Sequence, residues 1–170
     1  MSSTSARPLA VRQQKELLAE LRGLKRFCVS LTGSEADADD LLQGTVERLL
    51  SRGVPADAHT ARWAYRVCKN LWIDELRSRE VRTRHATGVI QAGEAVEVSP
   101  SAEVQSEGER SLAAVKNALA ALPEEQRLSL TLVAVEGKSY AEAAEILEVP
   151  IGTIMSRIAR ARKQLVKAVD

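Results

Sequence analysis

A basic stretch near the C-terminal end of the chain has residue types and a spacing that suit the binding of phosphate. In "IGTIMSRIARARKQL", residues 151–165, Ser156, Arg160 and Lys163 recur every three to four positions, so they share one face of a helix. Further bases beside them are Arg157 and Arg162, and the apolar positions of a different face are Ile151, Ile154, Ile158 and Leu165. A charged face alone is usually a solvent-exposed face, so the elements that position this one must decide whether it binds an anion.

The residues before this stretch predict a helix-turn-helix. "SYAE", residues 139–142, is a capping box in which the Ser139 hydroxyl and the Glu142 carboxylate bind free N–H groups at a helix start. The helix is expected to end near Leu147, and "EVP" then turns the chain into residues 151–165. In helix-turn-helix modules the second helix enters the DNA major groove. This placement favours DNA over solvent as the partner of the basic face.

The composition of the chain indicates an all-helical protein. Of the 170 residues, 45% are hydrophobic, 28% are charged and only 3% are aromatic, and strand-type alternation is hard to find. Cys28 and Cys68 belong to no CxxC pair, so we expect buried free thiols in a reducing cytoplasm, with a redox pair as the alternative. No apolar run approaches membrane-spanning length and no signal-peptide core is present, so we expect a cytoplasmic protein without membrane insertion.

The formal net charge of +1 conceals three charged blocks. Residues 34–47 hold five acids and no base, residues 62–85 hold seven Lys and Arg against three acids, and residues 151–170 hold five bases against one acid. Separate blocks of opposite sign indicate separate partners. We expect a basic partner for the first block and an anionic partner for the other two.

Helical periodicity and loop composition predict an all-α fold of two small domains, residues 10–85 and 111–170. Residues 86–110 hold three glycines, one proline and five acids without sustained periodicity, so we expect a flexible acidic linker there. The expected helices are 11–31, 35–50, 60–79 with a bend or break near Asn70, 111–122, 124–136, 140–147 and 151–165.

Three ordered motifs resemble the extracytoplasmic-function (ECF) sigma factors of the bacterial sigma-70 family. They are "DADDLLQGTVERLL", "ARWAYRVCKNLWIDELRSR" and "LPEEQRLSLTLVAVEGKSYAEAAEILEVPIGTIMSRIARARKQL". The resemblance covers about residues 10–85 and 111–168, and "GTIMSR" is similar to alphaproteobacterial groups that include general-stress-response sigma factors. It implies a sigma-2 helical bundle and a sigma-4 helix-turn-helix domain. The implied function is to bind core RNA polymerase and direct promoter-specific initiation by recognising −35 and −10 elements.

The first motif matches the helix with which the family binds the coiled coil of the largest catalytic polymerase subunit. The polymerase-binding residues implied by the resemblance are Asp39, Asp40, Leu42, Gln43 and Glu47. Acids and an amide on an exposed helix face suit a basic partner, and the polymerase flap is a further expected partner. Gly44 and Val46 depart from the family's usual acid and Phe, and a glycine inside a helix costs about 1 kcal/mol relative to Ala.

The second motif matches the family's segment for promoter melting and −10 recognition. The implied DNA-binding residues are Arg62, Arg66, Lys69, Asn70, Asp74 and Arg77. Unpaired DNA requires cations along a groove and groups that hold unstacked bases, and Asn70 is similar in position to the family residue that helps capture a flipped base. We expect Trp63 in the core, whereas Tyr65 and Trp72 fit either the core or a base-stacking platform.

The end of the third motif matches the family's −35 reader. The implied DNA-binding residues are Thr153, Met155, Ser156, Arg157, Ala159, Arg160, Arg162 and Lys163, with Arg157, Arg162 and Lys163 near phosphates and the others near bases. Met155 stands where many relatives have Lys or Arg, and it implies an apolar contact such as a thymine methyl. Glu148 stands at the turn where many relatives have Gly, which accepts positive φ at little cost.

Other functions fit the residues less well. His59 and His85 lie near no plausible nucleophile, and no P-loop or metal-ligand spacing occurs, so we expect no enzyme activity, cofactor, metal or small-molecule substrate. The alternative function is a sigma-like partner-switching protein that sequesters an anti-sigma factor without binding DNA, and the retained basic blocks argue against it. A stand-alone helix-turn-helix repressor would leave residues 36–50 and 62–80 without a role. The family also implies an anti-sigma factor as a partner.

Overall fold

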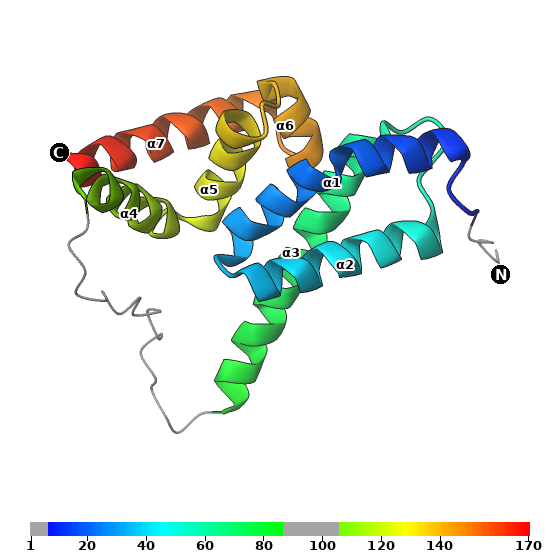
Figure 1. The fold of residues 1–170 in the computed structure, drawn as a ribbon, viewed down its shortest axis with the longest axis horizontal. Helices are drawn as coiled ribbons and strands as arrows, with labels where there is room; N and C mark the ends of the chain where they lie inside the picture. The colour runs from blue at the N-terminus through cyan, green and yellow to red at the C-terminus, as the bar shows by residue number, and fades with distance from the viewer. Residues whose placement is uncertain (1–6, 87–105) are drawn as a thin grey trace.

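The structure, a computed structural model, describes residues 7–86 and 106–170, and every regular element in these ranges is helical (Figure 1). The elements are α1 (Val11–Thr32), α2 (Glu35–Arg52), α3 (Thr60–His85), α4 (Glu107–Ala120), α5 (Glu124–Leu130), the π-helix η1 (Thr131–Val135), α6 (Tyr140–Leu147) and α7 (Ile151–Val169). The predicted all-helical fold is confirmed. Most of the predicted linker, residues 87–105, lies outside the described ranges. Within them, no helix is long and apolar enough to cross a membrane.

Helices α1, α2 and α3 form a bundle around an apolar core. Phe27 of α1 packs edge-on against Tyr65 of α3, with ring centroids 5.3 Å apart. The Sγ atoms of Cys28 and Cys68 lie 3.5 Å apart beside this pair. Both cysteines are buried free thiols, as the sequence predicts.

The turns of the first bundle follow from local sequence signals. Gly33 ends α1 in the left-handed region, at φ 69°, and its N–H donates to the Val29 carbonyl. The Ser34 hydroxyl then accepts the Asp37 N–H at the start of α2. Gly53 ends α2 at φ 76°. The short turn at Gly33 and Ser34 folds α2 back along α1, and the loop that begins at Gly53 leads into α3, as Figure 1 shows.

Helix α3 is one uninterrupted helix instead of the bent or broken helix predicted near Asn70. Its 26 residues contain no Gly or Pro, and the exposed Asn70 side chain points away from the core. The helix also continues past the predicted end at Arg79 to His85. Exposed pairs four residues apart support this extension, such as Arg84 with Glu80 at 2.7 Å. The extension projects beyond the bundle (Figure 1).

The second bundle, α4 to α7, begins earlier than the predicted residue 111. Ser106 and Glu109 form a capping box that starts α4 at Glu107: the Ser106 N–H donates to the Glu109 carboxylate at 2.9 Å, and the Glu109 N–H donates to the Ser106 hydroxyl at 3.3 Å. The helix predicted over 124–136 is α5 followed by η1. It stops before Gly137, which has φ 66°.

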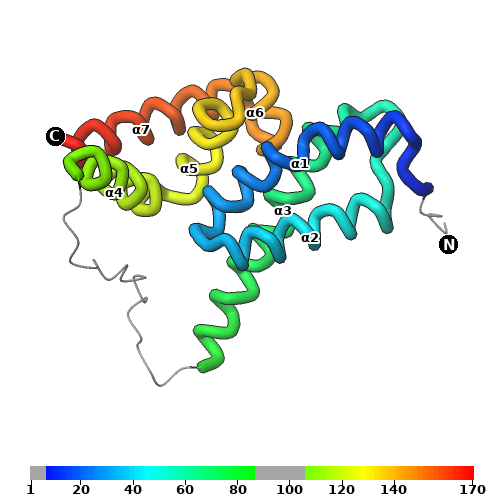
Figure 2. The backbone as a smooth tube through the Cα atoms, in the orientation of Figure 1, coloured from blue at the N-terminus to red at the C-terminus, as the bar shows by residue number. Residues whose placement is uncertain are grey.

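The two bundles pack against each other and share one continuous apolar core. Helices α1 and α3 of the first bundle lie beside η1 and α6 of the second (Figure 2). Leu132 of η1 and Ile146 of α6 are fully buried. The first part of the basic segment of α3, from Arg62 to Lys69, faces the second bundle, and this arrangement determines which predicted DNA contacts are accessible.

Candidate nucleic-acid and protein-partner interfaces

The outer face of α7 is exposed and carries bases between short polar and apolar groups. Met155 is 52% exposed. The predicted −35 residues that are exposed are Met155, Ser156, Ala159, Arg160, Arg162 and Lys163. Thr153 and Arg157 are half-buried, and an Arg157 Nη2 lies 3.3 Å from the Glu125 carboxylate of α5. The inner face holds Ile154 and Ile158 as predicted, together with Ala161. Ile151, predicted on the same face, is 49% exposed, and the ion pair with Glu125 turns Arg157 away from the predicted phosphate contact.

The elements that orient α7 are the capping box of α6 and the turn after it. The Glu142 N–H donates to Ser139 Oγ at 3.1 Å, and the Ser139 N–H donates to Glu142 Oε2 at 3.2 Å. This second bond holds the pKa of the Glu142 carboxyl below its usual value. Glu148 ends α6 in the left-handed region at φ 57°, and the Val149 N–H donates to the Ala144 carbonyl. The turn therefore forms without the glycine that the family pattern suggests.

The start of the basic face on α3 is paired with acids of α6. Arg62 lies 2.8 Å from the Glu145 carboxylate and 3.3 Å from that of Glu142. Lys69 Nζ lies 3.3 Å from a carboxylate oxygen of Glu148, and the residue is only 6% exposed. Three successive acids of the helix-turn-helix thus neutralise side chains that the sequence assigns to DNA.

Arg66 is held at the same boundary between the bundles. Its Nη2 donates to the Glu145 carbonyl at 2.7 Å, and its guanidinium lies 5.4 Å from the centre of the Trp63 ring. Three of the six predicted −10 residues therefore lie under α6. They are Arg62, Arg66 and Lys69.

The other three predicted −10 residues, Asn70, Asp74 and Arg77, line an open groove of the first bundle. All three are exposed, and the groove encloses about 1120 Å³ between α2 and α3. Trp63 is half-buried, packs against the core as predicted, and also borders this groove. An amide, a carboxylate, a guanidinium and an aromatic ring are thereby brought together in one open site.

Tyr65 and Trp72 are core residues and cannot serve as base-stacking platforms in this arrangement. Tyr65 is fully buried, which raises the pKa of its hydroxyl. Trp72 is buried as well, and its indole N–H donates to the Glu124 carboxylate of α5 at 2.7 Å. The sequence left both rings as either core residues or base-stacking platforms, and the structure places both in the core.

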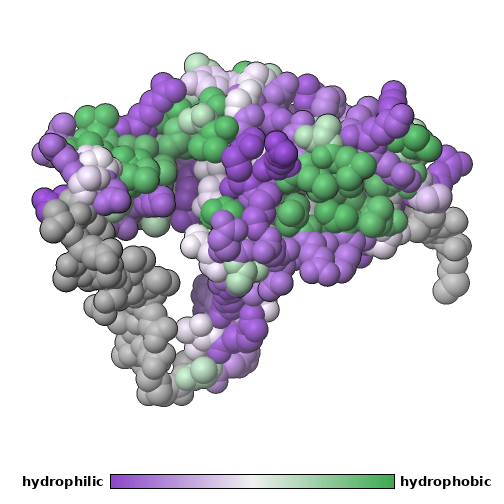
Figure 3. Space-filling model, viewed as in Figure 1, coloured by the Kyte–Doolittle hydropathy of each residue, from purple (hydrophilic) through white to green (hydrophobic). Residues whose placement is uncertain are grey.

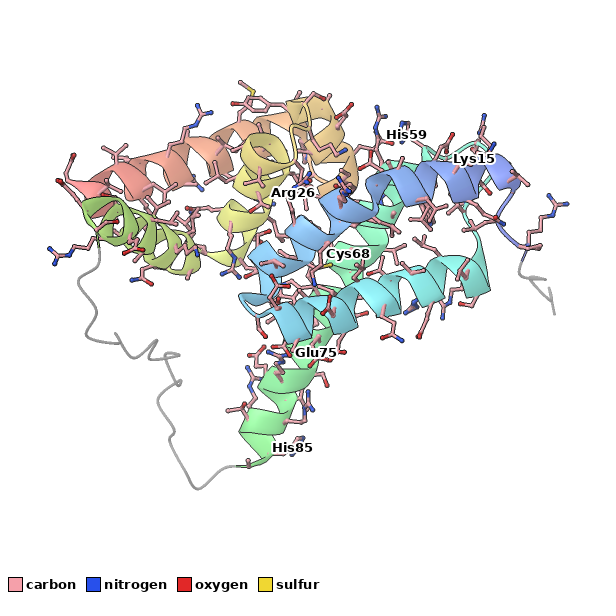
Figure 4. All side chains as sticks on the ribbon, in the orientation of Figure 1. Lys15, Arg26, His59, Cys68, Glu75 and His85 are labelled. Carbon is pink, nitrogen blue, oxygen red and sulfur yellow. The ribbon has the colours of Figure 1, made fainter. Side chains whose placement is uncertain are left out.

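A polar contact between the bundles was not predicted from the sequence. The Glu136 carboxylate, whose side chain is 1% exposed, lies 3.1 Å from Arg26 Nη2 and accepts the Tyr65 hydroxyl at 3.2 Å. Arg26 points from α1 toward the second bundle in Figure 4. Gly23 leaves room for this contact, because a Cβ there would lie 2.9 Å from the Glu136 carboxylate and closer still to the Tyr65 hydroxyl. A glycine inside a regular helix was the available sequence signal.

The acidic face of α2 is exposed on the side predicted to bind polymerase. The exposed members of the set are Asp39, Asp40, Gln43 and Glu47, whereas Leu42 is half-buried and packs against the core. The Gln43 amide donates to the Glu47 carboxylate at 3.3 Å. Asp39 pairs with Lys25 and thereby raises the pKa of that ammonium group. Asp40 and Glu47 form no ion pair among the described residues, so they are available to a basic partner.

An apolar area lies between α1 and α2 (Figure 3), and the exposed apolar side chains of these helices include Leu18 and Leu50.

Gly44 on α2 does not serve close packing, because an added Cβ would meet only Leu71 at 4.0 Å. The loss of helix stability that a glycine causes is therefore not offset by closer packing at that position.

The described residues contain no cluster of three or more His, Cys, Asp and Glu side chains that could hold a metal ion. His59 and His85 lie at the two ends of α3, as Figure 4 shows. A helix of 26 residues separates them by roughly 40 Å. The two histidines therefore cannot act on one substrate within this chain.

Comparisons with known proteins identify both bundles. Residues 17–82 match the family described as Sigma-70 region 2, and residues 112–165 match Sigma-70, region 4. The ECF RNA polymerase sigma factor EcfG of Rhodopseudomonas palustris is 32% identical over 160 residues, which cover 93% of this chain and 85% of that protein. The chain belongs to the ECF sigma factors of the sigma-70 family. It is a transcription initiation factor for RNA polymerase and not an enzyme.

Other ECF sigma factors show the same relationship. SigM of Mycobacterium tuberculosis is 34% identical over 151 residues, covering 86% of this chain and 71% of that protein. Among solved structures, the sigma factor RpoE of Bartonella quintana, in complex with the anti-sigma factor NepR, superposes with a TM-score of 0.75 at 28% identity. The superposition covers 94% of this chain and 98% of that one. The anti-anti-sigma factor PhyR from the same organism, at 18% identity and a TM-score of 0.61, shares the fold alone.

Proposed function

We propose that this sigma factor divides its work among three helices. The α2 face around Asp40 binds core RNA polymerase, the α3 groove around Asn70 opens and reads the −10 element, and α7 reads the −35 duplex. The observation that carries the proposal is the exposed outer face of α7, which holds bases beside Met155 and Ser156. The opposite face of the helix holds the buried Ile154 and Ile158. Cations for phosphates beside small groups for base edges are what a major-groove helix requires.

The polymerase contact is supported by the free acids of α2. Asp40 and Glu47 are exposed, and the face they share is the acid-only block of the sequence. Acidic charge opposite a basic coiled coil speeds association and fixes its orientation. The polymerase flap is the expected second contact, through the α4–α7 bundle.

The expected cellular setting follows from the relatives. An anti-sigma factor is the proposed inhibitor, since the superposed RpoE structure contains one, and a general stress response is the proposed process because of the similarity to EcfG. Polymerase and promoter DNA are both in the bacterial cytoplasm, which is therefore the proposed location. A membrane-bound partner would act on this chain through its cytoplasmic side.

The test is transcription with purified core polymerase on a promoter that this chain selects. Asp40→Asn/Gln43→Ala is expected to weaken core binding about fivefold or more, because one charge and one amide of the contact are lost. The matched control is Glu35→Gln/Asp37→Asn in the first turn of α2, where the acids complement the helix dipole. Binding is read by titrating labelled chain with core polymerase.

If the control pair weakens core-polymerase binding equally, the α2 face around Asp40 is not the polymerase contact. Failure of the wild-type chain to support any transcription, with intact binding to an anti-sigma factor, would favour the sigma-like partner-switching alternative. The two results are distinguished in one set of reactions.

A further inference from the structure

A basic groove of the first bundle extends beyond the residues used in the −10 proposal. Its volume of about 1120 Å³ exceeds the roughly 300–1,000 Å³ of pockets that enclose one small ligand. Three segments line it: the residues before and at the start of α1, the end of α2 with its following loop, and the middle of α3. The basic side chains in the lining are Arg7, Arg12, Arg48, Arg52, Lys69 and Arg77, and the acidic one among the described residues is Asp74.

Residues 7–13, called the N-terminal strap below, form a fixed wall of this groove. Gln13 is buried, and its Nε2 donates to the Val54 carbonyl in the loop after α2, at 3.2 Å. Gly53 makes room for the strap, because a Cβ there would lie 2.5 Å from the Arg7 carbonyl oxygen. Its φ of 76° also favours glycine. The beginning of α1 accordingly lies beside this loop in Figure 1.

The arginines at the strap end of the groove lack acidic partners in the described part of the chain. Arg7, Arg48 and Arg52 take part in no ion pair there, and Arg12 pairs only with half-buried Glu16 at 3.4 Å. Like charges gathered in one groove repel one another until an anion binds. Guanidinium groups also match the geometry of phosphate oxygens.

We propose that the N-terminal strap and the end of α2 form a phosphate-binding extension of the −10 groove for the unpaired promoter strand. The inference rests on the proposed function. Asn70 and Asp74 supply hydrogen-bonding groups for a base at one end of the groove, and the arginines bind the backbone that leads away from that base. The strap precedes the matched segment 17–82, so the family match assigns it no role.

The experiment measures binding of the full chain to a labelled single-stranded oligothymidylate of about 12 nucleotides. Fluorescence anisotropy is recorded between roughly 50 and 200 mM salt, because phosphate contacts are independent of sequence but sensitive to salt. Arg7→Ala is expected to weaken binding severalfold. It should also lower the slope of log K against log salt by about 0.7, the value for one phosphate contact on a single strand. Arg48→Ala/Arg52→Ala should lower the slope by about 1.4.

The matched control is Lys15→Ala/Arg22→Ala, which removes two exposed bases of α1 that do not line the groove. Arg7→Lys keeps the charge and is expected to keep the slope. Circular dichroism verifies that each variant is folded. The inference is overturned if the groove variants bind like the control variant, or if the wild-type chain does not bind the oligothymidylate.

Transcription with core polymerase separates this inference from the proposed function. Promoter-specific transcription by the wild-type chain, together with normal promoter opening and normal oligothymidylate binding by Arg7→Ala, would reject the extension and leave the sigma-factor function intact. Absence of transcription by the wild-type chain would reject the proposed function itself.

Discussion

The outer face of α7 and the basic face of α3 are both rich in bases, but they differ in what covers them. Arg160 and its neighbours on α7 face solvent, whereas Arg62 and Lys69 on α3 are paired with acids of α6 and of the turn after it. Helix α6 therefore has two roles. It leads into α7 on one side, and its acids pair with bases of α3 on the other.

The cover over α3 is electrostatically weak. The side chains of Glu145 and Glu148 are 46% and 53% exposed, and a partly exposed pair such as Arg62–Glu145 contributes about 0.2–1 kcal/mol. Salt near 0.15 M also screens charges beyond about 8 Å. A DNA strand can therefore compete for these bases of α3, but only after α6 has moved away from them.

The largest expected effect tests the exposed basic face of α7. Arg160→Ala should reduce transcription from a promoter with an intact −35 element on the order of tenfold, because a base or phosphate contact worth about 1–3 kcal/mol is lost. Lys167→Ala, in the last turn of α7, is the control. The loss should vanish on promoters whose −35 element is scrambled, and an equal loss on both promoters would contradict the assigned role.

A similar loss is expected on the melting side, in the part of α3 that α6 leaves open. Asn70→Ala should slow promoter opening about tenfold while leaving core-polymerase binding unchanged, because a base-edge contact in the groove is removed. Stopped-flow fluorescence of 2-aminopurine in the −10 element reports the opening. Ser78→Ala, an exposed change farther along α3, is the control. Unchanged −10 preference in the Asn70 variant would show that the groove does not read this element.

A smaller effect is expected when the ion pairs that hold α6 against α3 are removed. Glu145→Gln/Glu148→Gln removes two charges that face α3, whereas Glu142 is kept because it caps α6. We expect a larger radius of gyration by small-angle X-ray scattering and severalfold tighter binding of single-stranded DNA. The control pair Glu80→Gln/Glu107→Gln removes equal charge away from this contact. Identical scattering of both variants would show that these ion pairs do not hold the bundles together.

The smallest effect concerns the helix that both regions share. Ser139→Ala should cost about 1 kcal/mol through loss of the cap, which lowers the melting temperature by about 2–4 °C. The Glu142 carboxylate makes a separate contribution, which Ser139→Ala retains because the donor is the backbone N–H of residue 139. That bond depresses the pKa of Glu142, so its contribution is complete above pH 4.5, the usual value, and is lost as the pH falls through the lower folded pKa. Thermal melts of this variant beside Ser78→Ala measure the loss of the hydroxyl, and melts of the wild-type chain as the pH is lowered follow the contribution of the carboxylate. A melting temperature equal to that of Ser78→Ala would show that the Ser139 hydroxyl does not stabilise the fold.

Features with local causes were predictable from the sequence. The capping box at 139–142, the end of α1 at Gly33 and the buried isoleucines of α7 each depend on residues within a few positions of one another. The family motifs added the functional assignment of each helix. The start of α4 was misjudged, although Ser106 and Glu109 carry the same capping pattern as α6, and so were the predicted bend near Asn70 and the end of α3.

The contacts between the bundles could not be predicted in this way. Arg62 and Glu145 are 83 residues apart, and no periodicity links them. The hydrogen bonds of the buried Tyr65 and Trp72 likewise go to side chains of the second bundle, Glu136 and Glu124. An exposed basic helix face and one covered by distant acids look alike in a sequence. The accessibility of the α3 bases therefore required the fold.

The central claim is that the chain reads two promoter elements with two separate helices. Transcription of a fragmented genomic library by purified core polymerase, with and without the chain, tests it most directly. We predict start sites that depend on the chain and share two elements at a fixed spacing, with Arg160→Ala losing the sites that rely on the upstream element and Asn70→Ala losing discrimination at the downstream one. Start sites that share only one element, or no start site that depends on the chain, would contradict the account.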